Sequence, residues 1–420
     1  MYLIYRFLTV LFFPILIILI FLRKFYNKED DRSFSQKVFS TTSKNKKNSK
    51  LIWFHGSSIG EMISILPIVK FFLNKKNTDI LITSNSITSG KMIEQYCKKE
   101  KNIFHQYLPL DIPHLNKKFL NKWKPSVAIF IDSEIWPNFI YYIKKRNIKL
   151  ILINARITNK TYKKWKVFKN SAKKIFSSFD LCIASSRESL KYLKNLSAKN
   201  IKFFGNLKYI ASAGSAKIKN KKIHNIKNRK VWCAASTHPG EEIFCVKAHH
   251  KIKKSHNNIL TIIAPRHIKR VPVVSEICRQ NKLKYQIVKN TNEKIFDKTE
   301  ILIVNSFGLL PLYYSISKSV FMGKSLLKNL ILVGGQNPIE AARIGCKIYS
   351  GPFVYNFNEV YQFLIKNKIA KKIKSVDHLA ILIIKDLKNR AKKNSIKLKQ
   401  IDKYGSEIYK QTIHVLEKVI

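Results

Sequence analysis

Polar residues with the potential for chemistry stand directly after short apolar runs in the first half of the chain. The run at 51–54 is followed by HGSSIGE at 55–61, which joins two glycines and two serines to the carboxylate of Glu61. A tight turn of this composition opens a helix and presents backbone N–H groups to an anion. The motif alone favours a simpler role for Glu61, in which it complements the helix dipole from the first turn.

A second group of carboxylates follows another apolar run. In DSEIWPN at 132–138, Asp132 and Glu134 lie two residues apart, beside a tryptophan and a proline. They can orient a cation or raise the basicity of Glu61, or Asp132 can simply cap the loop. Further on, GNLKY at 205–209 places Lys208 beside a Gly-Asn turn after a strand, and that position sets it apart from the other basic residues.

The second half of the chain has three comparable motifs. They are ASTHPGEE at 235–242, APRH at 264–267 and GGQNPIEAA at 334–342. In APRH, Arg266 is suited to a phosphate or a base. In GGQNPIEAA, Asn337 fits the N-cap of a helix, Pro338 its first position and Glu340 its third. Glu340 therefore either caps that helix or binds ribose hydroxyls.

The elements that must position these residues are short apolar runs separated by longer amphipathic stretches. This alternation predicts α/β units with parallel, doubly wound sheets, in which ligands bind after the carboxyl ends of the strands. The expected domains are 35–210 and 231–405, joined by a linker at 211–230 and followed by a C-terminal helix at 406–420. The expected strands are 51–54, 80–83, 127–132, 150–154, 181–184, 201–204, 231–234, 260–264, 285–288, 301–304, 319–322 and 347–349.

The first residues of the chain form an apolar segment. Residues 2–22 are long enough for a membrane span, interrupted only by Arg6, and Arg23, Lys24 and Lys28 follow. No small-residue cleavage site is present, which argues against a removable signal peptide. The positive flank predicts a single-pass anchor with the body of the protein in the cytoplasm. An interfacial hairpin and a buried core helix are the alternatives.

The overall composition is strongly basic. A formal net charge of +54 is compatible with nucleic-acid binding, with a general drift toward lysine, and with anionic lipid surfaces. The charge is spread along the whole chain, so no specific nucleic-acid partner is expected. The cysteines and histidines show no metal-binding spacing, so no bound metal and no cofactor are expected.

The order of the motifs is specific where each motif alone is weak. The chain resembles the bacterial 3-deoxy-D-manno-octulosonic acid (Kdo) transferases, specific for lipid A, along nearly its whole length. The resemblance rests on the apolar start, HGSSIGE, DSEIWPN, GNLKY, AASTHPGEE, APRH, FG at 307–308, and GGQNPIEAA followed by GPFVYNF.

The resemblance implies a GT-B fold, with two Rossmann-like domains facing a cleft and an N-terminal membrane anchor helix. It implies transfer of Kdo from CMP-Kdo to a lipid A precursor (lipid IVA) at the inner membrane, with inversion and without a metal. Glu61 would be the general base, and Asp132 or Glu134, together with Lys208, would stabilise the transition state. The implied CMP contacts are Pro265, Arg266, Phe307, Gly308, Leu309, Asn337, Pro338, Ile339 and Glu340.

Two positions depart from the family pattern. Leu309 and Ile210 stand where the resemblance leads one to expect acidic residues. An alternative function is therefore another GT-B glycosyltransferase that uses a different nucleotide sugar on a membrane acceptor.

Overall fold

The computed structural model describes residues 2–41, 50–98, 100–210, 226, 229–290, 293–306, 308–388 and 395–420. The chain divides into two compact units. Unit 1 comprises Met1–Ala211 with Tyr404–Ile420, and unit 2 comprises Ser212–Lys403. Nearly all of the linker expected at 211–230 lies outside the described residues.

Unit 1 is a Rossmann-like layer structure around a parallel sheet. Within the described residues its seven strands have the order β3-β2-β1-β4-β5-β6-β7. Their interiors are continuous apolar runs because helices cover both faces of such a sheet. The strands are β1 (Lys50–His55), β2 (Thr78–Ser84), β3 (Ile103–Tyr107), β4 (Val127–Ile131), β5 (Lys149–Ala155), β6 (Leu181–Ala184) and β7 (Ile201–Phe203).

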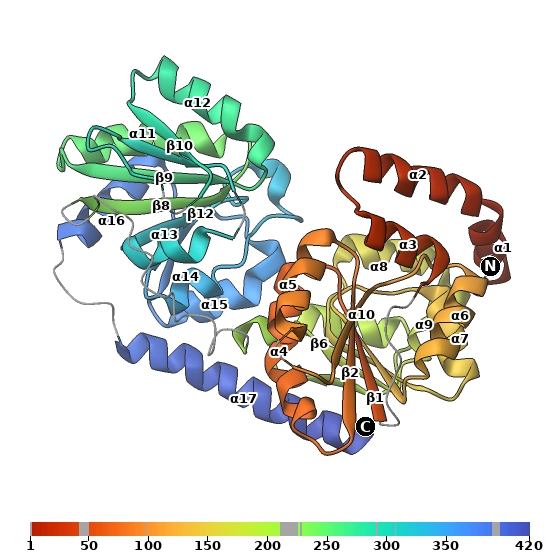
Figure 1. Ribbon diagram of the computed structural model, residues 1–420. Helices are drawn as coiled ribbons and strands as arrows, with labels where there is room; N and C mark the ends of the chain where they lie inside the picture. The colour runs from red at the N-terminus through yellow and green to blue at the C-terminus, as the bar shows by residue number, and fades with distance from the viewer. Residues whose placement is uncertain are drawn as a thin grey trace. The chain divides into compact units, whose positions relative to one another are not determined.

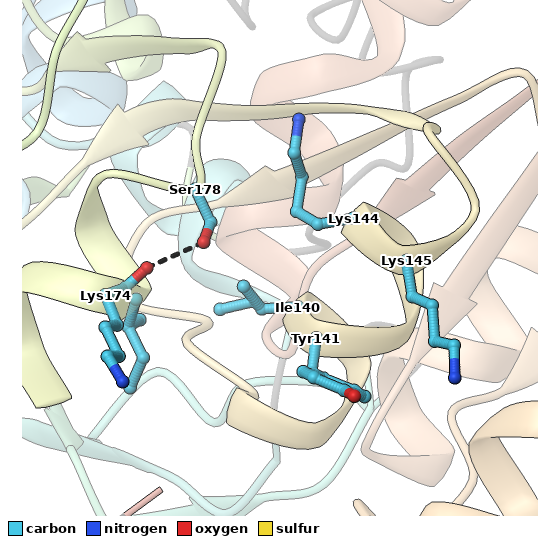
Figure 2. Close-up of a pocket in the computed structure, with 7 residues that line it drawn as sticks. Ile140, Tyr141, Lys144, Lys145, Lys174 and Ser178 are labelled. Atoms are coloured by element: carbon cyan, nitrogen blue, oxygen red, sulfur yellow. Dashed lines mark hydrogen bonds between the residues drawn. The ribbon is translucent and has the colours of Figure 1, made fainter.

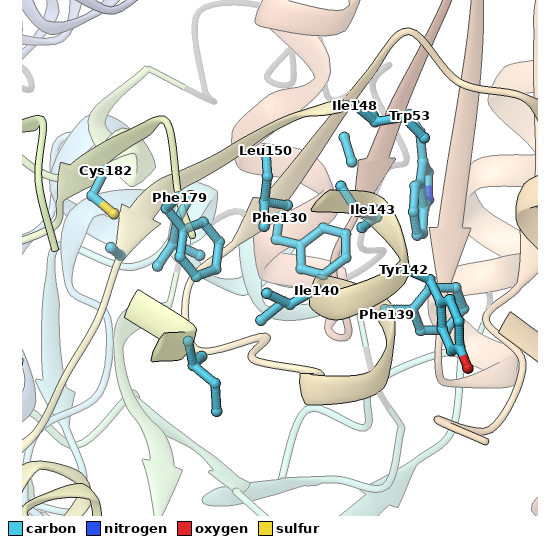
Figure 3. Packing of buried hydrophobic residues seen from close by; sticks show 14 of the residues in the cluster. Trp53, Phe130, Phe139, Ile140, Tyr142, Ile143, Ile148, Leu150, Phe179 and Cys182 are labelled. Carbon is cyan, nitrogen blue, oxygen red and sulfur yellow. The ribbon is translucent and has the colours of Figure 1, made fainter. Parts of the chain in front are cut away.

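The core of unit 1 joins the sheet to its helices. Trp53, Phe130 and Phe139 pack ring against ring, and aliphatic side chains from β5 and from α7 (Pro137–Lys145) fill the space around them (Figure 3). The helices are α4 (Ile59–Leu73), α5 (Ile87–Cys97), α6 (Pro113–Trp123), α7 (Pro137–Lys145), α8 (Asn159–Val167), α9 (Lys169–Phe176), α10 (Arg187–Asn195) and the 3₁₀ turn η1 (Leu207–Tyr209).

Unit 2 repeats this architecture. Its seven described strands have the order β10-β11-β9-β8-β12-β13-β14. They are β8 (Lys230–Thr237), β9 (Ile259–Pro265), β10 (Tyr285–Val288), β11 (Ile301–Val304), β12 (Ser319–Met322), β13 (Lys347–Ser350) and β14 (Ala370–Lys372). The helices include α11 (Glu241–Lys253), α12 (Val271–Gln280), α13 (Leu310–Ile316), α14 (Ile339–Arg343), α15 (Asn358–Lys366) and α16 (Val376–Lys388).

The last helix, α17 (Ser395–Val419), returns the chain to unit 1. The ring of Tyr404 packs edge-on against Tyr209, with centroids 5.0 Å apart. Gly205 has φ +121°, and a Cβ there would lie 2.7 Å from Ile408. The end of the chain therefore packs directly on the GNLKY segment.

Among the described residues, three helices of unit 1 precede the first sheet: α1 (Tyr2–Leu11), α2 (Phe13–Phe25) and α3 (Asp31–Phe39) (Figure 1). The prediction of one continuous helix over 2–22 was wrong, because the segment bends by 56° between α1 and α2. Among the described residues no one helix is long and apolar enough to cross a bilayer, although this bent pair meets the length and composition test when taken together.

All the strands expected from apolar runs are present, and the α/β class with parallel sheets is confirmed. Two strands were missed. β3 includes His105 and Gln106, which are buried although polar, and β14 is only three residues long. Neither shows the apolar run on which the other strands were recognised.

Candidate active site

Two loops of unit 1 meet where the order of the strands reverses. β1 lies between β2 and β4, so the chain leaves β1 toward one side of the sheet and later returns on the other. Ligands of doubly wound sheets bind outside the carboxyl ends of the strands at such a switch point. Glu61 follows β1, and Asp132 and Glu134 follow β4, so both predicted motifs stand at this point.

Glu61 closes a capping box at the start of α4. Its backbone N–H donates to Ser58 Oγ at 3.3 Å, and its Oε1 accepts a hydrogen bond from Ser58 Oγ at 2.7 Å. Its Oε2 accepts from the backbone N–H groups of Ser57 and Ser58 at 2.7 and 3.3 Å. A carboxylate has about four acceptor positions, so these three donors orient Glu61 and leave Oε1 able to accept another proton.

Asp132 is a buried carboxylate in an unusual backbone conformation. Its φ of +62° is in the left-handed region, and the loop is held by hydrogen bonds between Asp132 and both Ile153 and Arg156. Burial raises the pKa of Asp132, and the nearby charges of Glu61 and Glu134 add to this, while Lys208 and Arg156 lower it. These residues therefore form one electrostatically connected cluster.

Lys208 enters this cluster from the far edge of the sheet. Its Nζ lies 4.0 Å from Asp132 Oδ2, and only 18% of its side chain is exposed. Asn206 accepts a hydrogen bond from the Lys208 backbone N–H, and Asn154, at the end of β5, accepts one from Leu207, each at 3.0 Å. The side chains of Asn206 and Asn154 therefore fix the backbone of the 3₁₀ turn that carries Lys208.

Glu134 is held by a separate network. Its Oε2 lies 3.0 Å from His55 Nε2, and it accepts hydrogen bonds from Trp136 Nε1 at 2.9 Å and Asn85 Nδ2 at 3.3 Å. Thr83 Oγ1 lies 2.9 Å from the other imidazole nitrogen. Burial alone would raise the pKa of Glu134, but the hydrogen bonds from His55 and Trp136 and the charge of His55 outweigh burial and lower it.

In unit 2 the motifs again follow the strands. Pro265 is the last residue of β9 and is buried, whereas Arg266 is exposed directly after it, its backbone N–H bound to Thr237 O at 3.0 Å. Phe307 lies outside the described residues. Gly308 has φ +83°, and Leu309 precedes α13 as its N-cap.

The GGQNPIEAA motif forms a tight turn before α14. A Cβ on Gly334 would lie 2.3 Å from Phe353 O, and Gly335 has φ +93°. Asn337 Oδ1 accepts a hydrogen bond from the Ile339 N–H at 3.1 Å. Pro338 is the N-cap residue, so α14 starts one residue later than expected and Glu340, which is exposed, stands at its second position.

Glu241 is a structural carboxylate that the sequence did not single out. It is buried at the switch point of unit 2, where β8 separates β9 from β12. Its two oxygens accept backbone hydrogen bonds from His238, Lys324, Ser325 and Leu326 at 2.9, 2.6, 2.8 and 3.2 Å. Burial raises its pKa, and these four bonds oppose that effect. Glu241 therefore joins the loops that follow β8 and β12.

His55 is the other residue that sequence analysis missed. A histidine at the end of an apolar strand was the available signal, but its partner Glu134 is 79 positions away. The structure thus brings Glu61, Asp132, Glu134 and Lys208 together in unit 1. Apart from Phe307, the predicted nucleotide contacts lie in unit 2, at the end of β9, in the loop after β11, and in the turn and first residues of α14 before β13.

Known proteins are similar to this chain in sequence. The model of the family described as 3-deoxy-D-manno-octulosonic-acid transferase matches residues 32–211. A 3-deoxy-D-manno-octulosonic acid transferase of Rickettsia bellii is 31% identical over 378 residues, which cover 89% of this chain and 88% of the relative. The chain belongs to the Kdo transferase family. A Haemophilus influenzae Kdo transferase is 30% identical over 75% of this chain and 74% of its own length.

Solved structures support the fold of this Kdo transferase. A glycosyltransferase from Rickettsia africae has a TM-score of 0.56 at 13% identity and covers 89% of this chain and 99% of its own. The UDP-GlcNAc 2-epimerase of Neisseria meningitidis has a TM-score of 0.57 at 12% identity, covering 88% and 99%. At such identities these likenesses concern the fold alone, the two-domain α/β architecture of GT-B enzymes.

Proposed function

We propose that this Kdo transferase moves Kdo from CMP-Kdo to a hydroxyl of a lipid A precursor, inverting the anomeric centre and using no metal. The observation that carries the proposal is the cluster at the unit 1 switch point in a chain of this family. There a hydrogen-bonded carboxylate, Glu61, interacts electrostatically with Asp132, whose carboxylate faces Lys208 at 4.0 Å.

Glu61 acts as the general base. As the acceptor oxygen bonds to the anomeric carbon, its proton passes to Glu61 Oε1, and the bond from that carbon to the CMP phosphate oxygen breaks. The hydrogen bonds from Ser57 and Ser58 fix the carboxylate in place before the substrate arrives. A base positioned in this way contributes roughly 10²–10⁴-fold to the rate.

The basic residues act on the charge that develops. Departure of CMP leaves negative charge on a phosphate, and preorganised cations stabilise such charge without a metal ion. Lys208, held by its caps, and Arg266, exposed after β9, are the proposed cations. Asp132 keeps Lys208 in position, and Pro265, Phe307, Gly308, Leu309, Asn337, Pro338, Ile339 and Glu340 are the proposed CMP contacts.

The acceptor is a lipid, so the enzyme must work at a membrane. We place it on the cytoplasmic face of the inner membrane, attached through the apolar residues of α1 and α2. The formal charge of +54 favours attraction to anionic lipid and to the phosphates of the acceptor.

The proposal is tested with membranes that carry the full chain. They are incubated with lipid A precursor, Kdo, CTP and a CMP-Kdo synthetase, and mass spectrometry measures the mass added to the lipid. We expect a Kdo increment with the wild type and a loss of at least about 10²-fold in rate with Glu61→Gln. Glu276→Gln, on the exposed face of α12, is the matched control and keeps the wild-type rate.

Absence of a Kdo increment from folded wild-type protein would contradict the proposed acceptor or donor. Replacing the CMP-Kdo supply with other nucleotide sugars then tests the alternative glycosyltransferase. A full rate in Glu61→Gln would show instead that another group is the base.

A further inference from the structure

The two N-terminal helices present apolar side chains to the outside of unit 1. None of the residues of α2 is buried. The large apolar side chains exposed on the pair and at the bend between them are those of Leu3, Ile4, Phe7, Leu8, Val10, Leu11, Phe12, Ile15, Ile18, Leu19, Phe21, Leu22 and Phe25. An apolar surface of this size on a folded domain indicates contact with a lipid or a protein partner.

The first of these helices, α1, is held against the rest of unit 1 by polar contacts. Tyr5 OH donates a hydrogen bond to the buried carboxylate of Asp111 at 3.0 Å. One turn later, Thr9 Oγ1 accepts from Asn138 Nδ2, also at 3.0 Å. Between them Arg6 donates to Tyr142 OH at 2.7 Å, and its guanidinium lies over the Tyr141 ring.

The C-terminal end of α2 is also held by polar contacts. Glu29, just after α2, is buried and accepts two hydrogen bonds from Arg23, at 3.0 and 2.9 Å. Its other oxygen accepts one from Lys37 of α3 at 2.6 Å. Lys37 also donates to Asn85 O at 2.7 Å, so this cluster reaches the loop after β2. Separating Glu29 from Lys37 would leave two buried charges without their partner, so this cluster resists moving away from unit 1.

We propose that α1 and α2 lie in the plane of the membrane surface, with both ends of the segment on the cytoplasmic side. The two ends of a single-pass anchor lie on opposite sides of a bilayer, whereas Tyr5 and Arg23 here bind residues of one folded unit. The inference rests on the proposed attachment to the inner membrane and replaces the single-pass anchor that the sequence suggested.

Helix length agrees with this arrangement. At 1.5 Å per residue, the 10 residues of α1 and the 13 residues of α2 extend for about 15 and 20 Å. The hydrocarbon core is about 30 Å thick, so neither helix reaches across it. In-plane helices instead bury one face about 5–10 Å deep and keep basic groups at the headgroups.

Basic residues flank the apolar surface where headgroups would lie. Arg23 and Lys24 stand in the last turn of α2. On α7, Tyr141, which contacts Arg6, also lines a cavity of about 470 Å³ together with Lys144, Lys145 and Lys174 (Figure 2). The cavity is otherwise lined by Ile140, Ile175 and Ser178, and Lys144 is paired with Asp180 at 2.9 Å.

The same contacts connect the lipid-facing helices to the site. Asp111 also accepts hydrogen bonds from the backbone N–H groups of Asn138 and Phe139 in the first turn of α7, and this helix begins within the DSEIWPN motif. Asn85, whose carbonyl binds Lys37, donates its side-chain N–H to Glu134 at 3.3 Å. In-plane attachment would thus hold the acceptor-side loops at a fixed distance from the lipid surface.

The test is the topology of the full chain, carrying one epitope before Met1 and a different one after Ile420, in a Gram-negative host. Proteinase K is added to intact spheroplasts or to inverted inner-membrane vesicles, and each epitope is followed by immunoblot. We expect both epitopes to survive in spheroplasts and both to be lost in inverted vesicles. Loss of the N-terminal epitope in spheroplasts, or recovery of the chain in the soluble fraction, would overturn the inference.

A second measurement addresses the polar contacts of α1. In detergent, the double variant Tyr5→Phe/Thr9→Val should be cleaved by trypsin at Arg6 faster than the wild type. Tyr26→Phe, at an exposed position after α2, is the matched control and should be cleaved at the wild-type rate. Equal rates for all three proteins would show that these contacts do not hold α1.

Kdo transfer is measured in the same vesicles, which separates this inference from the proposed function. Cytoplasmic epitopes without Kdo transfer would reject the function and keep the topology. Kdo transfer with a periplasmic N-terminus would do the reverse.

Discussion

His55 Nε2 lies 3.0 Å from Glu134 Oε2, and this pair joins the end of β1 to the loop after β4. The imidazole is buried, and Thr83 contacts its other nitrogen, so its orientation is fixed by the sheet itself. Glu134 is consequently held by three donors, whereas Asp132 faces a lysine at 4.0 Å. Of the two carboxylates in DSEIWPN, Glu134 is the more firmly positioned.

The stability that Glu134 contributes should depend on pH. Its folded-state pKa is lowered, so the contribution is complete above the unfolded value of about 4.3 and is lost as the pH falls through the folded value. We expect Glu134→Gln to lower the free energy of unfolding by about 1–3 kcal/mol at neutral pH and by progressively less below about pH 4. Denaturant unfolding of both proteins across this range checks it; a difference independent of pH would contradict it.

Replacing Lys208 with methionine should reduce kcat. The substitution keeps most of the side-chain volume and removes the cation proposed to stabilise the departing phosphate, so we expect a loss of about 10²–10³-fold. Lys202→Met, at an exposed position on β7, is the matched control and should retain the wild-type kcat. Single-turnover rates with saturating donor measure the step, and equal rates for both variants would exclude this role.

Glu241→Gln should destabilise unit 2. The carboxylate accepts four backbone hydrogen bonds, and an amide nitrogen in place of one oxygen leaves its buried donors without an acceptor. Unsatisfied buried groups cost about 1–3 kcal/mol each. Thermal unfolding of this variant is compared with that of Glu276→Gln, which lies on an exposed face of α12 and should be near neutral. Equal stability of the two variants would count against the proposed role of Glu241 in joining the loops after β8 and β12.

Substitution by alanine should impair donor binding at one glycine and stabilise the protein at another. A Cβ on Gly334 would lie 2.3 Å from Phe353 O, so Gly334→Ala must move the turn before α14 and should raise the KM for CMP-Kdo. Gly60 is the second residue of α4, and a Cβ there would meet nothing within 4 Å apart from the backbone of the helix itself. Gly60→Ala should therefore stabilise the protein by about 0.4–1 kcal/mol, mainly by restricting the unfolded chain. Calorimetry with donor titration checks both variants, and destabilisation by Gly60→Ala would show that α4 is strained.

Most strands, and the motifs that follow them, could be predicted because buried parallel strands are continuous apolar runs. β3 could not, since its His105 and Gln106 are buried through specific partners: Ser84 binds the histidine, and Trp123 donates to the glutamine. Those partners become neighbours only once the sheet has formed. Periodicity in the sequence contains no information about them.

The candidate site was predicted to a similar extent. Glu61, Asp132, Glu134 and Lys208 were recognised from motifs at strand ends, but the contacts that position them were not. The contact between His55 and Glu134 forms only because β1 and β4 are neighbours in the sheet, although β2 and β3 lie between them in the sequence. The N-terminal segment shows the same limit, because apolarity suits a spanning helix and a docked helix equally. The deciding partners, Asp111 and Asn138, lie more than 100 residues away.

The return of α17 to unit 1 affects how the chain is made. Tyr404 and Ile408 cover Tyr209 and Gly205, yet all of unit 2 is translated between them. A nascent chain can form the first sheet while the ribosome is still synthesising unit 2, but the surface around GNLKY stays uncovered until the final residues emerge. A chain terminated at Lys403 would keep every residue of the candidate site and still lack the packing on Gly205 and Tyr209, the neighbours of Lys208 in GNLKY, so a late stop codon should be as damaging as a substitution in a catalytic motif.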